Sequence, residues 1–441
     1  MSFRERIVVV TTKMLMVWLL GTGALYGQST LLVGTPVPTP FPINNTYGNI
    51  YVDVSADATA MLFNSNRDGF GPIGRSDLWV AGRLSATSDW LEPVELGAPI
   101  ESTAFEYGLE ISPNGLEMFF GRAPAFENRF DTTALWVSRR NAMGDPWGEP
   151  EVVTAVDLPG SERWPAISPN GLELYFDVGT ADTSQIYVSH RDTLSGEFGP
   201  PAHVFQGGAP SLSPNGLIMV FDSNQRGGAG AFDLFVSRRT SLDAPWETPT
   251  RLAGAINGSF LDGDAEFSPD GRWLYFDSDR PGVPTGQPYG QWGIWQAPLL
   301  YDVGDFNYDE RLDGRDIDDL RANFGTPYVA YDLDGSGVVD PGDVDYFLSE
   351  IMGTTSGDAN LDGTVDDADF DVWLVSAFQS GTGWGSGDFT GDGVTDGLDF
   401  HIWLRNRSLS PDAESIPEPS GVLFGLCGVA MALGRRRRQG R

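Results

Sequence analysis

Short apolar segments recur along the first 300 residues, each directly after a Ser-Pro-Asn-Gly or Ser-Pro-Asp-Gly tetrapeptide. The four clear tetrapeptides begin at Ser112, Ser168, Ser213 and Ser268, and a degenerate fifth, Ser55-Ala56-Asp57-Ala58, precedes Met61-Leu62-Phe63. Pro and Gly supply the backbone angles of a tight turn, so each apolar segment is expected to be a β-strand that follows a turn. The copies recur roughly every 45 to 57 residues, which is typical of a propeller blade rather than of a helical solenoid.

Three further features repeat around each turn and predict four short strands per unit. An Asp/Ser-rich hairpin with an Arg is expected after the first apolar strand, as at Asn64-Ser65-Asn66-Arg67, Asp222-Ser223 and Asp277-Ser278-Asp279-Arg280. A third strand follows, and the fourth opens with an aromatic residue and a proline, as in Trp90-Leu91-Glu92-Pro93 and Trp246-Glu247-Thr248-Pro249. Proline suits only an edge strand, because it lacks a ladder donor.

The closure of the ring is predicted by a spare strand near the N-terminus. The fifth repeat ends at Ile294–Pro298 without a fourth strand of its own. Upstream, Pro36-Val37 and Pro42-Ile43 have the same separation as Pro93-Val94 and Pro99-Ile100 of the first repeat. We therefore expect residues 34–300 to form an all-β five-bladed propeller whose last blade is completed by the N-terminal strand, which removes exposed sheet edges.

The repeated turn resembles that of the TolB-like, or WD40-like, β-propeller repeats. The resemblance covers about residues 34–300 and implies a β-propeller fold. It implies no particular activity, because propellers host binding and catalysis alike.

Composition narrows the range of functions. The chain of 441 residues has 61 acidic and 28 basic residues, a formal net charge of −33. Nucleic acid is excluded as an expected partner, because phosphate binding needs clustered basic residues. The acidic excess favours cation binding or a solvated acidic surface. A single cysteine, Cys427, excludes an intramolecular disulfide framework.

Acidic residues at equivalent positions of the blades are the candidate functional residues of the propeller. Asp53, Glu110 and Glu266 stand two residues before the turn position, and Glu106, Glu162 and Asp262 stand six before it. If these strands line the channel, Glu106, Glu110, Glu162 and Glu266 are candidate ligand-binding residues. The alternatives are carboxylates that are solvated or paired with Arg67, Arg122, Arg226 and Arg280. Paired carboxylates can also hydrolyse glycosides if their separation is suitable, but no catalytic residue is assigned.

Four acidic loops, each followed by a short amphipathic segment, replace the strand pattern after Pro298. Oxygen-bearing residues at loop positions 1, 3, 5, 9 and 12 match the spacing of an EF-hand loop, with Gly at position 6 in the last three. The candidate calcium ligands are Asp305, Asn307, Asp309, Asp313 and Asp316; Asp332, Asp334, Ser336, Asp340 and Asp343; Asp358, Asn360, Asp362, Asp366 and Asp369; and Asp388, Thr390, Asp392, Asp396 and Asp399.

Residues 301–410 are similar to dockerin type I repeats, since position 12 is Asp and no convincing helix precedes each loop. The resemblance implies a small α-helical module folded by calcium, with a cohesin-like partner as one option. A spacer between propeller and membrane is the simpler alternative, and acidic linkers without metal are a further one. Glu310 at position 6 of loop one and Thr390 at position 3 of loop four depart from the pattern.

Both ends of the chain carry features of export. Residues 1–27 combine Arg4 and Arg6 with an apolar run and small residues, as a signal peptide does. Residues 411–441 contain Pro417-Glu418-Pro419, an apolar run and four arginines from Arg435, an order that resembles the PEP-CTERM sorting signal. That resemblance implies an exosortase partner, and the apolar run is short enough to suggest transient membrane contact.

The sequence favours an exported or cell-surface protein whose propeller binds an envelope polysaccharide or a protein partner. One alternative is a secreted glycan-active hydrolase that uses acidic residues of the propeller funnel. Another is a purely structural matrix or spacer protein. Binding is favoured over catalysis because no catalytic motif can be identified.

Overall fold

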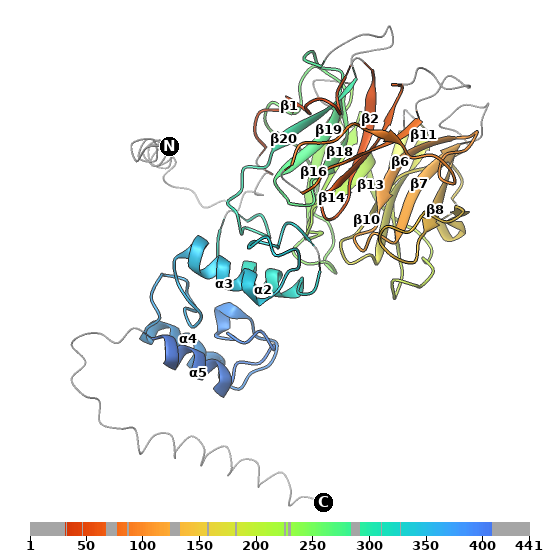
Figure 1. The fold of residues 1–441 in the computed structure, drawn as a ribbon. Helices are drawn as coiled ribbons and strands as arrows, with labels where there is room; N and C mark the ends of the chain where they lie inside the picture. The colour runs from red at the N-terminus through yellow and green to blue at the C-terminus, as the bar shows by residue number, and fades with distance from the viewer. Residues whose placement is uncertain are drawn as a thin grey trace, which may run out of the picture.

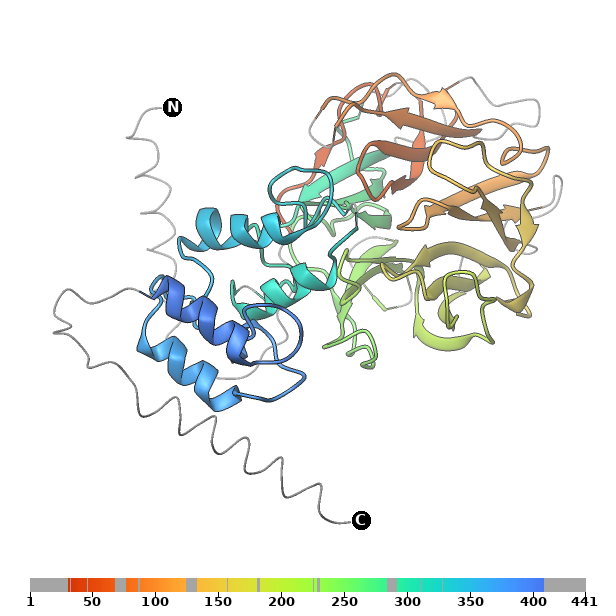
Figure 2. The same ribbon diagram turned by 60° about the horizontal axis from the view of Figure 1, so that its bottom comes forward.

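The computed structural model describes residues 31–407, except for positions 32, 46, 68–76, 86–87, 124–132, 157, 181–182, 225, 228–230, 284–291, 310 and 327. Five four-stranded antiparallel sheets follow one another in a ring, and a helical segment lies to one side of that ring (Figures 1 and 2). The expected signal peptide and sorting tail lie outside the described residues. None of the helices within the described ranges has the length and apolar character that a membrane span requires.

Each sheet is one blade; its strands run in chain order from the innermost outward, except in blade five, whose outermost strand is β1. Blade one contains β2 (Asn49–Val54), β3 (Ala60–Ser65), β4 (Asp77–Gly82) and β5 (Val94–Glu95). Blade two contains β6 (Phe105–Ile111), β7 (Glu117–Ala123), β8 (Ala134–Arg139) and β9 (Glu151–Val152), and a 3-10 turn, η2 (Thr154–Val156), follows it. Blade three contains β10 (Glu162–Ile167), β11 (Glu173–Thr180), β12 (Thr183–His190) and β13 (Ala202–Gln206). Blade four contains β14 (Gly208–Leu212), β15 (Ile218–Ser223), β16 (Asp233–Arg238) and β17 (Thr250–Arg251), and blade five begins with β18 (Asp262–Phe267), β19 (Trp273–Ser278) and β20 (Gly293–Pro298).

The N-terminal strand β1 (Val37–Pro38) completes blade five, which confirms the five-bladed propeller. Val37 pairs with Gln296 and Pro38 with Trp295. Asn44 fixes the end of this segment, because its buried side-chain amide donates to the carbonyls of Thr39 and Ile294 and accepts from the Ile294 N–H. Thus one side chain joins two segments that are 250 residues apart in the sequence.

The repeated turn serines hold the chain by their hydroxyl groups. The Ser168 hydroxyl donates to Asn170 Oδ1 (2.7 Å) and accepts from the Glu173 N–H (2.8 Å). Ser213 makes the equivalent bonds to Asn215 (2.6 Å) and from Ile218 (2.9 Å). Both serines are fully buried, so the polar groups that the turn exposes to the core are satisfied locally.

A β-bulge interrupts every innermost strand at the same position. The ladder register shifts once in each of β2, β6, β10, β14 and β18. The residue four before the turn position has a positive φ in all five blades, at Tyr51, Gly108, Trp164, Ala209 and Asp264. Four of these five are not glycine, and such left-handed residues cost on the order of 1–3 kcal/mol each. The surrounding ring must therefore hold them in place.

Two sets of hydrogen bonds pass from blade to blade along the axis. In the first set, Asp277 Oδ2 of blade five accepts from the Tyr51 N–H (2.8 Å), and Asp222 Oδ2 of blade four accepts from the Asp264 N–H (3.2 Å). In the second, three residues that stand two before a turn serine accept from the next blade: Asp53 from Ile111 N–H, Glu110 from Ile167 N–H and Ser211 from Phe267 N–H. We call these bonds the axial hydrogen bonds.

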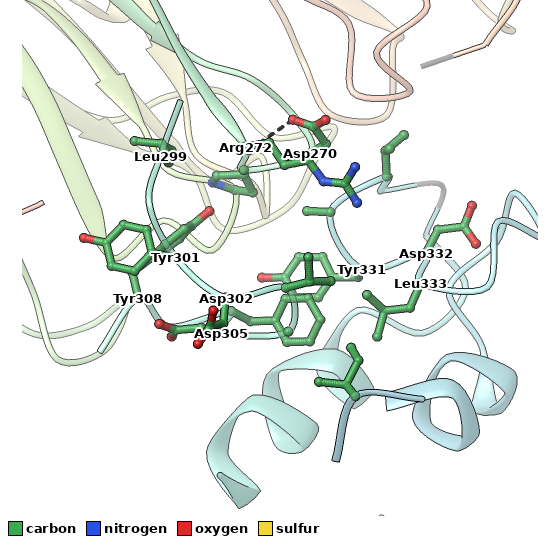
Figure 3. Close-up of a pocket in the computed structure, with 18 of the residues that line it drawn as sticks. Asp270, Arg272, Leu299, Tyr301, Asp302, Asp305, Tyr308, Tyr331, Asp332 and Leu333 are labelled. Carbon is green, nitrogen blue, oxygen red and sulfur yellow. Dashed lines mark hydrogen bonds between the residues drawn. The ribbon is translucent and has the colours of Figure 1, made fainter. Parts of the chain in front are cut away.

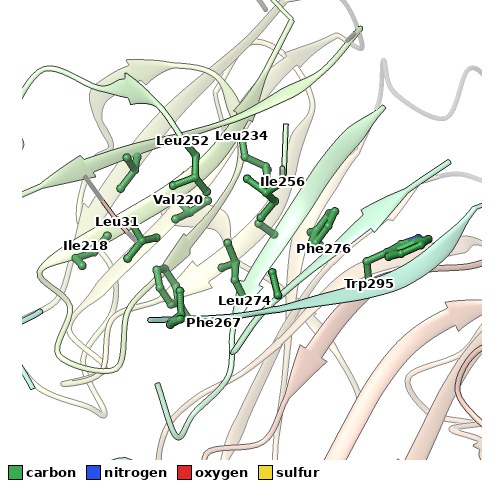
Figure 4. Close-up of a cluster of buried hydrophobic side chains, with 14 of the residues drawn as sticks. Leu31, Ile218, Val220, Leu234, Leu252, Ile256, Phe267, Leu274, Phe276 and Trp295 are labelled. Atoms are coloured by element: carbon green, nitrogen blue, oxygen red, sulfur yellow. The ribbon is translucent and has the colours of Figure 1, made fainter. Parts of the chain in front are cut away.

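Apolar side chains fill the space between neighbouring blades. The largest cluster joins blades four and five and includes Val220, Leu234, Phe267, Leu274 and Phe276 (Figure 4). Leu31, from the start of the described chain, packs into the same cluster. The N-terminal segment thus contributes to the core as well as to the sheet edge.

The helical segment consists of two pairs of short helices. It contains α2 (Gly314–Ala322), α3 (Pro341–Tyr346) continued by η3 (Phe347–Met352), α4 (Asp367–Ser376), η4 (Trp384–Ser386) and α5 (Gly397–Asn406). Each α-helix begins with an Asp N-cap and a complete capping box whose second member is also Asp, an arrangement that satisfies the free N–H groups of the first turn. Phe306, Ile317, Phe347, Trp384 and Trp403 belong to a separate core.

The propeller and the helical segment are in direct contact. The Asn215 side chain donates to Phe306 O (2.6 Å), and Arg238 Nη1 donates to Tyr308 O (3.0 Å). The Tyr308 ring is buried against the blade four and five cluster. Tyr328 contacts the turn of blade three, where its hydroxyl donates to Pro169 O (2.7 Å).

We expect replacement of Asn44 by Ala to destabilise the propeller by about 1–3 kcal/mol, because the buried Ile294 N–H would lose its acceptor. Chemical unfolding followed by tryptophan fluorescence measures this change. Asn45→Ala is the matched control, because Asn45 is half-buried and its side chain accepts a local bond from the Tyr47 N–H. Equal losses of unfolding free energy in the two variants would contradict the role of Asn44 in holding the N-terminal strand on blade five.

Candidate functional site

The bulges direct side chains into a cavity of about 280 Å³ in the propeller channel. Four of the five left-handed residues line it together with Trp292 and Phe232, namely Tyr51, Trp164, Ala209 and Asp264. Tyr51 and Trp164 meet edge to face, with ring centroids 5.9 Å apart. Bulges re-aim side chains in this way at many sites. We call this space the channel cavity.

A fully buried ion pair forms one wall of the channel cavity. Arg163 Nε and Nη2 donate to the two carboxylate oxygens of Asp177, at 3.1 and 3.0 Å, and Nη2 also donates to Ser184 Oγ. The guanidinium carbon lies 4.6 Å from the centroid of the Trp164 ring. This bidentate geometry orients the arginine and fixes the indole beside it.

The carboxyl groups around the channel cavity have raised pKa values. Burial raises the pKa of Asp177 to about 6, although Arg163 opposes the shift. Burial raises the pKa of Asp222 to about 7, and it raises the pKa of Asp264 and of Asp277 well above the usual range. Asp277 Oδ1 is buried without a hydrogen-bond partner in the part of the chain that the structure describes. Of these groups, Asp222 and Asp264 line the cavity and favour the protonated form near neutral pH.

Sequence reasoning missed this group of aspartates. Asp177, Asp222 and Asp277 all stand nine residues after a turn serine, and the last two fall in the hairpins that the sequence predicts. The structure places them in β11, β15 and β19, where they are buried at the axis. Gly208 lies between two of them, since a side-chain carbon there would come within 3.0 Å of Asp177 and 3.3 Å of Asp222. Their common offset from the serine was the signal that could have identified them.

A second group of carboxylates lies at the other ends of the innermost strands. Asp53, Glu110 and Glu266 each place a carboxylate oxygen within 4.8 Å of the others, beside a cavity of about 90 Å³ that Tyr328 borders. Burial raises the pKa of Asp53 to about 7, and it raises the pKa of Glu110 and Glu266 well above the usual range. We call this space the rear cavity.

The four predicted ligand-binding residues fall into two pairs. Glu110 and Glu266 converge at the rear cavity, as the shared offset from the turn serine suggested. Glu106 and Glu162 lie near the opposite ends of β6 and β10. Glu106 forms an ion pair with Arg122 (2.9 Å), as one alternative expected, and Glu162 accepts from the Leu158 N–H. Asp262 is likewise paired with Arg280 (2.5 Å).

A third cavity, of about 330 Å³, lies where the propeller meets the helical segment (Figure 3). Arg272 and Asp270 border it from the turn of blade five, and Tyr331 and Asp332 from the helical segment. Tyr301 and Tyr308 stand on the connecting chain, with ring centroids 5.0 Å apart. We call it the junction cavity.

The acidic loops bring their oxygen-bearing side chains together by internal hydrogen bonds. The position-12 aspartates, Asp316, Asp343, Asp369 and Asp399, are fully buried and accept from the N-cap N–H of the helix that follows. The N-caps are the position-9 residues Asp313, Asp340, Asp366 and Asp396. At position 1, Asp332, Asp358 and Asp388 accept from the glycine N–H at position 6.

Positions 3 and 5 complete these rings of oxygen atoms. At position 3, Asn307, Asp334 and Asn360 accept from the N–H of the position-5 residue, and Thr390 instead donates its hydroxyl to Asp388. At position 5, Asp309, Asp362 and Asp392 accept from the N–H two residues on, and Ser336 donates to Val338 O. Asp305 at position 1 of loop one accepts from the Asp309 N–H.

The second loop has the donor set that suits a hard cation best. Asp332, Asp334 and Asp343 each offer a carboxylate oxygen within 4.8 Å of the other two. Asp332 Oδ1 is buried and has no hydrogen-bond partner among the described residues. Because calcium prefers oxygen ligands and carboxylates keep free lone pairs after one hydrogen bond, the residues fit calcium.

We expect Asp222→Asn to raise the stability of the propeller relative to wild type more at pH 8 than at pH 5. The native Asp222 carboxyl keeps its proton up to about pH 7, whereas an unfolded Asp loses it near pH 4. The contribution of this group to stability therefore falls as the pH rises between these values. A gain in Tm of about 3 °C or more at pH 8 is expected.

Thermal unfolding at the two pH values measures this difference, with the exposed Asp192→Asn as control. A variant Asp222→Asn that is less stable than wild type at pH 8 by a larger margin than at pH 5 would show that the native carboxyl is ionised.

Comparisons with known proteins identify no family. No protein-family model and no curated protein matches the chain. It is similar to the solved structure of a putative TolB from Agrobacterium tumefaciens, with 18% identity and a TM-score of 0.35 over 53% of this chain and 71% of that chain. TolB from Acinetobacter baumannii is similar at 16% identity and a TM-score of 0.32, over 58% of this chain and 54% of that chain. The catalytic domain of a Coprinopsis cinerea GH62 α-L-arabinofuranosidase is similar at 12% identity and a TM-score of 0.42, over 62% of this chain and 98% of that chain. These values are too low to support any statement about activity, substrate or partner, and the propeller fold stands on the strand pairing described above.

Proposed function

We propose that this chain is an exported envelope protein whose propeller binds a saccharide unit of a polysaccharide in the channel cavity. The observation that carries the proposal is the lining of that cavity, where Tyr51, Trp164 and Trp292 stand beside Asp222 and Asp264. Flat aromatic faces cover the apolar faces of sugar rings, and carboxyl groups bond to hydroxyls. A volume of about 280 Å³ is near the lower limit of ligand pockets, which suits a chain end or a single unit.

The raised pKa values favour a neutral, hydroxyl-bearing ligand. A protonated carboxyl can both donate to and accept from a hydroxyl group. A ligand recognised by ionised carboxylates would instead need a negative charge on Asp222 and Asp264. Burial disfavours that charge at both residues. A protein partner at the propeller, also expected from the sequence, would need a protruding side chain to enter this cavity.

In the same proposal, the helical segment is a calcium-stabilised, dockerin-like module. The oxygen donors of loops two, three and four support this part, as does the buried, unpartnered oxygen of Asp332. Calcium would bridge carboxylates that otherwise repel one another and would couple binding to folding. A cohesin-like partner remains a prediction from sequence.

The cellular location of the protein is proposed from the sequences of its N-terminal and C-terminal segments. The segment 1–27 supports export, and Pro417-Glu418-Pro419 with the apolar and arginine-rich residues after it supports sorting by an exosortase with transient membrane contact. The mature protein would then reach the cell surface or the medium, where polysaccharide is accessible.

A second candidate function is glycoside hydrolysis in the same cavity. Asp222, with a pKa near 7, has the protonation that a general acid needs at neutral pH. However, Asp222 also accepts a hydrogen bond from the Asp264 N–H of the next blade. A purely structural residue would make the same contact. We therefore favour binding over catalysis.

Trp292→Ala is expected to weaken saccharide binding about tenfold or more, because one aromatic face of the cavity would be lost. An array of purified envelope polysaccharides and their oligosaccharides, probed with residues 28–410, measures the affinity. Trp147→Ala is the control, because Trp147 lies under Arg140 at the outer part of blade two.

Equal weakening by both tryptophan variants, or binding of no saccharide by folded protein, would contradict the proposal and favour the structural spacer. Release of shorter saccharides that stops in Asp222→Asn would favour the hydrolase.

Removal of calcium is expected to lower the Tm of the helical segment. Extracellular calcium sites have Kd values of about 0.1–1 mM, and free calcium at ten times Kd stabilises by about 1.4 kcal/mol per site. Differential scanning calorimetry with calcium, with magnesium and with chelator measures the effect. Asp334→Asn should reduce the calcium response, and Asp345→Asn, an exposed residue of α3 outside the ligand positions, should leave it unchanged. A response that is the same in both variants would contradict this part of the proposal.

A further inference from the structure

The first acidic loop differs from the other three because an arginine side chain contacts its carboxylates. Arg315 Nη2 lies 2.6 Å from Asp309 Oδ2 and 2.7 Å from Asp313 Oδ2. Asp309 and Asp313 are positions 5 and 9 of the loop, so the guanidinium contacts two of the five candidate ligands. The equivalent residues of loops two to four are Gly342, Ala368 and Leu398, which have no charge.

The ion pairs alone would not prevent calcium binding. Arg315 is 59% exposed, and exposed ion pairs contribute little to stability. Two further differences add to the effect of the ion pairs. Position 6 is glycine in the other loops, where Gly337, Gly363 and Gly393 have φ values of 92°, 94° and 78°. Loop one has Glu310 there, and a side chain with a β-carbon disfavours this left-handed conformation.

A third difference is that loop one is attached to the propeller. The carbonyl groups of Phe306 and Tyr308, at positions 2 and 4, accept hydrogen bonds from Asn215 and Arg238 of blade four. The Tyr308 ring is buried in the core between blades four and five, and a side-chain carbon at Gly271 would come within 2.4 Å of its hydroxyl. The first half of the loop is thus held by protein contacts that need no cation.

We infer that loop one binds no calcium and instead attaches the helical segment to the propeller. Arg315 supplies the positive charge, and the propeller holds the loop backbone. Loops two, three and four are then the calcium sites. The inference depends on the proposed calcium binding and limits it to three ions. It also implies that the contact between propeller and helical segment at Phe306 and Tyr308 persists without calcium.

Counting the bound ions tests the inference. Native mass spectrometry of residues 28–410 in calcium gives the number of ions for wild type, for Asp309→Asn with Asp313→Asn, and for Asp362→Asn with Asp366→Asn. The two double variants change positions 5 and 9 of loops one and three, and Asn preserves the N-cap in both. Tm in chelator verifies that each variant is folded.

We expect three ions in wild type, three in the loop-one variant and two in the loop-three variant. Four ions in wild type, or loss of an ion in the loop-one variant, would overturn the inference and leave the calcium proposal intact. Absence of calcium from all three proteins would refute the calcium proposal itself, and with it the contrast between the loops.

Discussion

The axial hydrogen bonds are the interaction on which the rest of the structure depends. Among the described residues, four of the five blades offer a side-chain acceptor to a backbone N–H of the next blade, as Asp53 does to Ile111 and Asp277 does to Tyr51. The acceptors must be buried to reach the axis, so their charged forms are disfavoured and their pKa values rise. The ring tolerates this cost because an N–H group left unpaired at the axis would also cost about 1–3 kcal/mol.

The same bonds shape the channel cavity and connect it to the fold. They hold the left-handed residues, among them Tyr51 and Asp264, whose side chains line the cavity. A site built on strands that neighbouring blades fix is preorganised, so little conformational freedom remains to be lost when a ligand binds. At the other ends of the strands, Tyr328 of the helical segment borders the rear cavity.

Sequence periodicity predicted the fold well because propeller blades repeat both their turns and their edge prolines. The spacing of Pro36 and Pro42 even predicted the strand that completes blade five, and β1 confirms it. The site was less predictable. The convergence of Glu110 with Glu266 followed from a shared offset, but nothing in the sequence marks Tyr51 or Trp164 as left-handed, because tertiary packing imposes that conformation. The docking of loop one was equally invisible, since its acceptors are the backbone carbonyls of Phe306 and Tyr308, and every residue carries such a carbonyl.

Amide hydrogen exchange at the axis tests the central claim most directly. If the axial hydrogen bonds hold the ring, the amides of Tyr51, Ile111, Ile167, Asp264 and Phe267 should exchange only with global unfolding of the propeller. Their protection should then equal that of the amides of the buried second strands. Exchange of these five amides through local openings, while the second strands stay protected, would contradict the account and show that apolar packing between the blades holds the ring by itself.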